Sequence, residues 1–229
     1  MRKYAVIVAG GSGLRMGADK PKQFLLLRGK PILYYTIKQF FNAYPEIQIL
    51  LVLPKDFLKE GQELLKELDA SIDLQFVTGG ATRFHSVQNG LNCIKEQGIV
   101  FVHDGVRCLI TENLIKACYE QALAIGSAIP AVAATDSIRI VQGDTSQIAD
   151  RNLVRIIQTP QTFQTSLLLP AFDTEYVASF TDEATVVEGS GKMIHLIEGD
   201  YNNIKITRPV DLLIAENILK QRESDSNKF

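Results

Sequence analysis

The chain has 229 residues, of which 46% are hydrophobic and 22% are charged. This composition is typical of a folded globular protein and excludes a disordered tail, a coiled-coil rod and a collagen-like chain. The 24 basic residues nearly balance the 26 acidic residues, so nothing indicates a nucleic-acid binder. No apolar run approaches the ~20 residues of a membrane span, so no membrane partner is expected, and the length favours a single domain over residues 1–229.

The first residues and the cysteines indicate the compartment. The apolar start, residues 4–9, is short and runs into glycines, which favours a first strand over a signal peptide. Cys93, Cys108 and Cys118 are odd in number and lack CxxC spacing, so they predict neither a disulfide framework nor a zinc site. We therefore expect a cytoplasmic protein.

Apolar runs alternate with helical patterns along the first 133 residues. Strands are predicted at residues 4–8, 47–53, 74–77, 99–103 and 128–133. Helices are predicted at residues 31–42, 56–68, 83–96 and 112–125, with Pro31 as a first helical residue. Continuous apolar strands separated by helices favour a parallel sheet that is covered on both faces. The predicted fold class is therefore α/β, with a doubly wound, mostly parallel, Rossmann-like sheet.

The alternation ends after Ala134. Residues 137–151 predict a β-hairpin with Gly143 and Asp144 at its bend. Because an isolated hairpin is marginally stable in water, we expect this protruding arm to pack on the main domain or on a second subunit. The remaining chain predicts short helices at 166–172 and 183–188, a strand at 193–197, a helix at 209–221 and a frayed tail at 223–229.

A glycine-rich loop follows the first predicted strand. Ala9, Gly10, Gly11 and Gly13 are small, so backbone N–H groups there can turn toward an anion without obstruction by a side chain. The P-loop motif is absent because no Gly-Lys-Ser/Thr triplet follows. The dinucleotide fingerprint fails as well, because Met16 stands where its third glycine is required.

Three cations accompany this loop. Arg15, Lys20 and Lys22 lie within eight residues of one another, a density that suits a triphosphate. A surface loop with solvated charges is the alternative interpretation. The position directly after the first strand, at the edge where open α/β sheets bind ligands, favours the phosphate site.

Several segments resemble one known family in sequence and in order. The glycine loop ends in Pro-Lys-Gln at residues 21–23, and five further matching segments follow it. They are GGATRFHSV at 79–87, VHDGVR at 102–107, TPQTF at 159–163, TDEA at 181–184 and NIKITRP at 203–209. Together they resemble the 2-C-methyl-D-erythritol 4-phosphate cytidylyltransferase family of the sugar-nucleotide pyrophosphorylase superfamily.

This resemblance implies that CTP and 2-C-methyl-D-erythritol 4-phosphate react to give 4-diphosphocytidyl-2-C-methyl-D-erythritol and pyrophosphate, in non-mevalonate isoprenoid precursor synthesis. It implies that Arg15 and Lys22 contact the triphosphate and stabilise the transition state, because their charges persist at neutral pH. Gly80, Ala81 and Ser86 match the family's cytosine-reading loop. For Ser86, a helix-capping hydroxyl is the alternative.

Acidic and basic residues near the strand at 99–103 extend this site. Asp104 ends that strand, and a carboxylate there can help to hold Mg²⁺, the expected cofactor. A turn or N-cap aspartate is the alternative. Arg83 is expected to brace the cytosine loop, and Arg107 either faces phosphate or forms a structural salt bridge. His103 is expected to pack inside the protein, because no His/Cys cluster supports a zinc site.

The acceptor end is assigned by the same resemblance. Lys205 matches the family lysine that binds the acceptor phosphate. Ser137 and Arg151, which flank the hairpin arm, match residues that reach across a homodimer into the partner's site, and an ordinary surface hairpin is the alternative. Thr159 is expected to line the acceptor site, and Asp182 lies near the acceptor or caps a helix.

Three positions depart from the family pattern. Asn202 stands where family members often have an acidic residue, so a carboxylate bridging to metal at that point is in doubt. Ser137 replaces the usual threonine and keeps its hydroxyl. Cys108 replaces the usual proline, a change that concerns loop structure.

Two other functions remain open at this level. A ribitol-5-phosphate cytidylyltransferase shares the loop and takes a longer polyol phosphate, although residues 181–184 and 207–209 favour the erythritol enzyme. A non-catalytic nucleotide-binding relative is disfavoured because Arg15 and Lys22 are both present.

Overall fold

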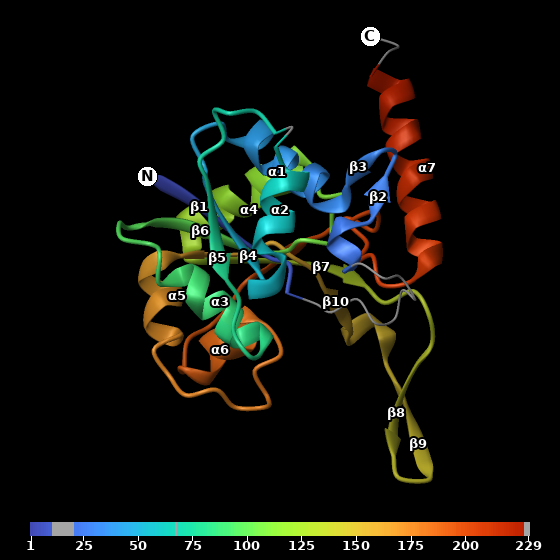
Figure 1. Cartoon of the computed structure of the whole chain (residues 1–229). Helices are drawn as coiled ribbons and strands as arrows, with labels where there is room; N and C mark the ends of the chain where they lie inside the picture. The colour runs from blue at the N-terminus through green and yellow to red at the C-terminus, as the bar shows by residue number, and fades with distance from the viewer. Residues whose placement is uncertain (11–20, 67, 227–229) are drawn as a thin grey trace.

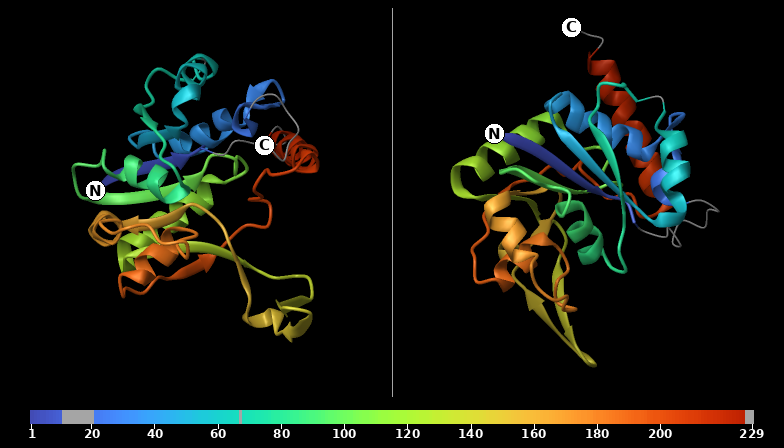
Figure 2. Two further views of the ribbon diagram at one scale, coloured as in Figure 1. Left: turned by 60° about the horizontal axis from the view of Figure 1, so that its bottom comes forward. Right: turned by 60° about the vertical axis from the view of Figure 1, so that its left-hand side comes forward.

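The structure is a computed structural model that describes residues 1–10, 21–66 and 68–226. Its centre is an eight-stranded mixed sheet with helices on both faces (Figure 1 and Figure 2). Its parallel part has the order β6-β1-β4-β5 and consists of β1 (Arg2–Val8), β4 (Gln48–Leu53), β5 (Leu74–Thr78) and β6 (Gly98–Asp104). The predicted doubly wound α/β fold is confirmed, with strand bounds close to those expected.

The other part of the sheet departs from parallel pairing. β11 (Gln161–Gln164) lies between β6 and β7 (Ser127–Ala133) and runs antiparallel to both. β10 (Arg155–Ile157) is antiparallel to β7, whereas β12 (Leu196–Glu198) is parallel to it. The sequence patterns did not predict β10 or β11, and β12 begins three residues later than expected.

Alternating side chains on the central strands divide the core into two layers. On β1, Ala5 and Ile7 face one layer, whereas Tyr4 and Val6 face the other. Helices that pack in the first layer are α1 (Ile32–Ala43), α2 (Leu58–Leu64) and α4 (Glu112–Ile125). Those in the second are α3 (Arg83–Leu91), α5 (Thr165–Ala171) and α6 (Glu183–Gly189). Because the strands are apolar on both faces, both need this cover.

Helix ends differ more from expectation than helix positions. α4 has the predicted bounds, but the predicted helix at 56–68 is a 3-10 turn, Lys55–Phe57, followed by the short α2. The predicted helix at 83–96 ends early as α3, because the Cys93 and Ile94 N–H groups bond to carbonyls three residues back. Pro31 precedes α1 as its N-cap instead of forming its first turn.

The last helix, α7 (Pro209–Ser226), lies along one side of the molecule (Figure 1). It continues past Glu223, where a frayed tail was predicted, and Arg28 Nη2 pairs with the Glu223 carboxylate at 2.8 Å. Residues 227–229 lie outside the described residues. Among the helices of the described ranges, none combines the length and apolar character that a membrane span requires.

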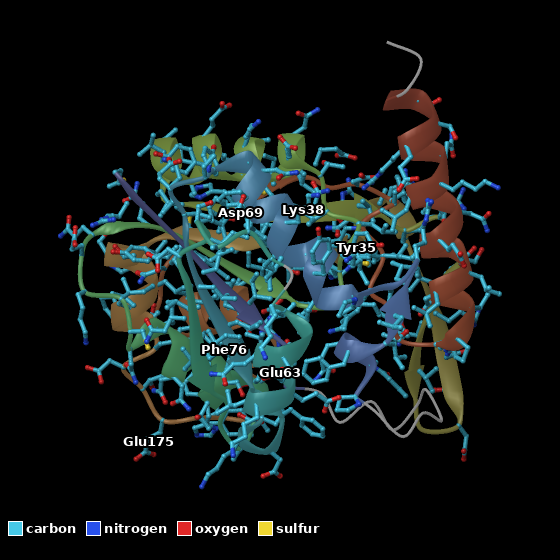
Figure 3. All side chains as sticks on the ribbon, turned by 45° about the horizontal axis from the view of Figure 1, so that its top comes forward. Tyr35, Lys38, Glu63, Asp69, Phe76 and Glu175 are labelled. Atoms are coloured by element: carbon cyan, nitrogen blue, oxygen red, sulfur yellow. The ribbon has the colours of Figure 1, made fainter. Side chains whose placement is uncertain are left out.

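A short two-stranded sheet, β2 (Leu26–Leu27) and β3 (Lys30–Pro31), lies beside α7 (Figure 1). Tyr35 of α1, labelled in Figure 3, donates its hydroxyl hydrogen to the Leu27 carbonyl at 2.7 Å. Together with Ala215 of α7 these residues belong to a third apolar cluster, which fixes the C-terminal helix on the body.

The arm is a separate hairpin of β8 (Ile138–Gln142) and β9 (Thr145–Ala149). It projects from the body of the protein (Figure 1). Gly143 in its turn has a φ of 57°, a conformation that glycine adopts readily. The predicted hairpin and its Gly-Asp bend are therefore confirmed.

Candidate active site

A pocket of about 320 Å³ opens at the carboxyl ends of β1 and β6. Val8 and Asp104 are register partners there, and the Gly105 N–H donates to the Val8 carbonyl at 2.9 Å. The chain passes from β1 to β4 on one side of this strand pair and from β6 to β7 on the other side, and open α/β sheets bind ligands at such switch points. The predicted site residues that line the pocket are Ala9, Gly10, Lys22, Gly80, Ala81, Ser86, Asp104 and Lys205.

The Asp104 carboxylate lies among three cations. Its Oδ2 is 2.8 Å from Lys205 Nζ and 3.7 Å from Arg107 Nε. Its Oδ1 accepts two longer bonds of 3.4 Å, from Nε and Nη2 of Arg83. Burial alone would raise the pKa of Asp104, but Arg83, Lys205 and Arg107 outweigh burial and hold this pKa well below its usual range. Asp104 is therefore ionised at neutral pH.

A second carboxylate, to which the sequence analysis gave no role, holds Arg83 from the other side. Arg83 Nη1 and Nη2 donate to Oε1 and Oε2 of Glu183 at 2.5 and 3.1 Å. Burial opposes the charge on Arg83, but Glu183 and Asp104 more than offset it, and the pKa of Arg83 lies above its ordinary value. Arg83 is thus a fixed cation on the pocket wall.

Hydroxyl groups order the loop that precedes α3. Thr82 is the N-cap of α3, and its Oγ1 accepts from the His85 N–H at 3.4 Å. Ser86 Oγ donates to the Thr82 carbonyl at 2.9 Å and accepts the Gly80 N–H at 3.1 Å. The alternative that Ser86 caps this helix is therefore wrong. A Cβ on Gly80 would lie 2.4 Å from His85 Cβ, so no side chain fits there.

Lys22 begins a 3-10 turn, Lys22–Phe24, directly after Pro21. The neighbouring Gln23 is 1% exposed, and its Nε2 donates to the Ala9 carbonyl at 2.7 Å. This bond ties the turn to the end of β1. Gln23 belongs to the Pro-Lys-Gln motif but had no predicted role.

Thr159 lies beneath Asp104 and does not line the pocket. Its Oγ1 accepts from the Asp104 N–H at 3.1 Å and is 3.1 Å from His103 Nδ1. Burial lowers the pKa of His103 to about 3, so the ring is neutral, and it packs edge-on against Phe40. Thr159 thus orients the end of β6, and the expected interior position of His103 is found.

Arg107 and Asp182 have structural partners. Arg107 Nη1 donates to the Asn203 carbonyl at 2.8 Å, which favours the salt-bridge alternative over a phosphate contact. Asp182 is the N-cap of α6, and its Oδ1 accepts from the Thr185 N–H at 2.9 Å. The helix-capping alternative for Asp182 is therefore the one that the structure contains.

Ser137 and Arg151 are not brought to this pocket. Both are exposed where they flank the arm, and Arg151 Nη1 donates to the Thr135 carbonyl at 2.7 Å. Their predicted place in a partner's site stays a prediction. Four residues of the glycine loop with predicted roles, Gly11, Gly13, Arg15 and Lys20, lie outside the described residues.

Among the described residues that line this pocket, Asp104 is the carboxylate that could hold a metal. Within the described ranges, no group of three or more His, Cys, Asp or Glu side chains could hold an ion by itself. Mg²⁺ is commonly bound by one or two carboxylates together with substrate phosphates. Asp104, an ionised carboxylate on the pocket wall, fits an ion that is shared with a bound triphosphate.

Comparison with known proteins gives consistent matches over nearly the whole chain. The model of the family described as IspD, 2-C-methyl-D-erythritol 4-phosphate cytidylyltransferase, matches residues 4–221. The 2-C-methyl-D-erythritol 4-phosphate cytidylyltransferases of Bacteroides thetaiotaomicron and Porphyromonas gingivalis W83 are 43% and 44% identical to it. The matched regions span 96% and 95% of this chain, and 100% and 98% of the two relatives, respectively. A crystal structure of 4-diphosphocytidyl-2C-methyl-D-erythritol synthase from Anaerococcus prevotii is 28% identical, with a TM-score of 0.81 and 96% coverage of both chains.

The doubly wound sheet and the pocket at its switch point define a nucleotidyltransferase of the α/β class. The extent of the family match narrows this class. The chain belongs to the 2-C-methyl-D-erythritol 4-phosphate cytidylyltransferase family, and it is a cytidylyltransferase of isoprenoid biosynthesis. The family match favours the erythritol enzyme over the ribitol alternative and over a non-catalytic relative.

Proposed function

We propose that this chain transfers the cytidylyl group of CTP to 2-C-methyl-D-erythritol 4-phosphate through the pocket at the switch point. The observation that carries the proposal is the placing of Lys22 and Gly10 in one pocket with Asp104 and Lys205. The pocket combines small residues, a lysine and an ionised carboxylate, and a metal-bound triphosphate requires this combination. The cytoplasm is the compartment we propose for it.

The reaction needs positioning more than covalent chemistry. A phosphate oxygen of the acceptor attacks the α-phosphorus of CTP, the bond to the β-phosphate breaks, and pyrophosphate leaves. Since the nucleophile is already anionic, no general base is required. Lys22 stabilises charge on the five-coordinate phosphorus, and Arg15, outside the described residues, has the same proposed role.

The two ends of the pocket bind the two substrates. Gly80, Ala81 and Ser86 line the pocket at the end proposed for cytosine, where backbone groups and one hydroxyl would be close to a bound base. Lys205 lies beside Asp104 with 42% of its side chain exposed, so its ammonium group can take a phosphate of the acceptor. Asp104 would hold Mg²⁺, which offsets charge on the triphosphate when bound.

A panel of nucleotides tests this function. With Mg²⁺ and methylerythritol phosphate, we expect pyrophosphate from CTP but not from ATP, GTP or UTP, and much slower release with ribitol phosphate. EDTA should stop the release, and excess Mg²⁺ should restore it, because the donor set needs the shared ion. Release from CTP without an acceptor, or equal release with all four nucleotides, contradicts the proposal.

We also propose a homodimer formed through the arm. Val141 and Ile148 of the hairpin are 72% and 76% exposed and share one face of its ladder, an arrangement that favours burial against another chain. In such a dimer, Ser137 and Arg151 of the partner subunit would complete the acceptor end of each pocket.

Charges on the arm test the dimer. We expect the double substitution Val141→Asp with Ile148→Asp to shift the protein to monomers, measured by sedimentation, because two carboxylates would have to be desolvated at the interface. Turnover should fall with it. Gln147→Glu, which adds a charge at a polar position of the same hairpin, is the control. A monomeric wild-type protein, or an unshifted double variant, contradicts the proposal.

A further inference from the structure

One buried carboxylate has no part in the proposed chemistry. Glu183 is 1% exposed, and both of its oxygens accept hydrogen bonds from the terminal nitrogens of Arg83. It does not line the pocket, whereas Arg83 does. Burying a carboxylate away from water costs free energy unless a cation is paired with it, so the Glu183–Arg83 pair is a specific buried interaction and not an incidental surface contact.

The peptide around Glu183 is fixed on several sides. Glu183 is the first residue of α6, directly after the N-cap Asp182 and its capping box with Thr185. Gln161 of β11 bonds to the same corner, donating from Nε2 to Asp182 at 2.9 Å and accepting the Ala184 N–H at 2.8 Å. The central sheet therefore sets the position of the Glu183 carboxylate, which in turn sets the position of Arg83.

Glu183 and Asp104 compete for one guanidinium group. The bonds from Arg83 to Glu183 are 2.5 and 3.1 Å long, whereas both bonds to Asp104 Oδ1 are 3.4 Å. The guanidinium group is thus held mainly by Glu183. Asp104 Oδ1 is engaged only weakly and retains capacity to accept a ligand in the pocket.

We propose that Glu183 is a positioning residue for the nucleotide end of the pocket, acting through Arg83. It holds the guanidinium plane on the wall and keeps it from closing onto Asp104. Without this carboxylate, Arg83 would form a tight pair with Asp104, and Asp104 Oδ1 would be occupied. The inference rests on the proposed function, because it assumes that CTP binds at this wall.

The substitution Glu183→Gln keeps the volume of the side chain and removes its charge. We expect it to weaken CTP binding about tenfold, the effect of one charge-assisted hydrogen bond. Binding is measured by calorimetry without acceptor, and the KM for CTP should rise by the same factor. The KM for the acceptor should stay within about twofold, since the acceptor end lies beyond Asp104. Glu188→Gln, an exposed glutamate on the same helix, is the matched control and should bind CTP as the wild type does.

A double-mutant cycle separates positioning from folding. In an Arg83→Gln background, adding Glu183→Gln should change CTP affinity no further, because Glu183 acts through the missing guanidinium. This double variant leaves no unpaired buried charge, so it carries the test if Glu183→Gln alone melts below the assay temperature. Three results would overturn the inference. They are a further loss of CTP affinity in the Arg83→Gln background, equal losses of affinity for both substrates, and a folded Glu183→Gln variant with unchanged CTP affinity. If the wild type itself does not bind CTP, the proposed function fails instead.

Discussion

Lys22→Ala is expected to lower the turnover of CTP and acceptor by about 10²–10³-fold, the effect of removing one donor to a developing oxyanion. Lys22 lies on the pocket wall at the start of a short 3-10 turn, which the Gln23 amide ties to the end of β1. The loss should therefore appear in kcat while the melting temperature stays near that of the wild type. Pyrophosphate release and a thermal melt measure the two quantities.

The chain contains a close structural match for the control. Lys55 also begins a three-residue 3-10 turn that follows a proline and ends in a phenylalanine, but it is exposed and does not line the pocket. Lys55→Ala removes the same side chain from the same local geometry and should leave turnover unchanged. Near-normal turnover of folded Lys22→Ala, or a comparable loss in Lys55→Ala, contradicts the role assigned to Lys22.

The main architecture was predictable because it depends on apolar periodicity. Runs such as residues 47–53 are apolar on both faces, which requires a covered parallel sheet. β11 was not predictable in this way, since its sequence Gln-Thr-Phe-Gln is polar at three of four positions. Gln161 and Thr162 are buried all the same, because their side chains bond to α6 and to the backbone. The local sequence pattern of residues 161–164 does not reveal these hydrogen-bond partners.

The candidate site likewise contains some residues whose position follows from the fold class and others whose position depends on tertiary contacts. Gly10 and Asp104 lie at the carboxyl ends of β1 and β6, so their convergence at one sheet edge follows from the fold class. Glu183 is 100 positions from Arg83 in the sequence, and only the packing of α6 against the sheet brings the two together. Contacts of this kind depend on tertiary structure, and the spacing of residues does not encode them.

Asp104→Asn is expected to affect both stability and activity. The substitution leaves Arg83, Arg107 and Lys205 around a neutral amide, and breaking a buried pair of this kind costs about 3 kcal/mol. This is the low end of the usual range, because Lys205 is 42% exposed and Arg83 keeps Glu183 as a partner. Turnover should fall by at least about 10²-fold, since the carboxylate proposed to hold Mg²⁺ is lost. Urea unfolding and pyrophosphate release measure the two effects.

The pH dependence of the stability difference identifies its origin. The pKa of Asp104 is held below its ordinary value in the folded protein, so ionised Asp104 stabilises the fold above the unfolded value of about 3.9. As the pH falls below about 4, the unfolded chain binds a proton before the folded protein does, and this contribution declines. The difference in unfolding free energy between wild type and Asp104→Asn should therefore be constant near neutrality and shrink in acid. Asp173→Asn, at an exposed position, should show no such difference. If the difference between wild type and Asp104→Asn were the same at pH 7 and in acid, lost packing and not charge would be the cause.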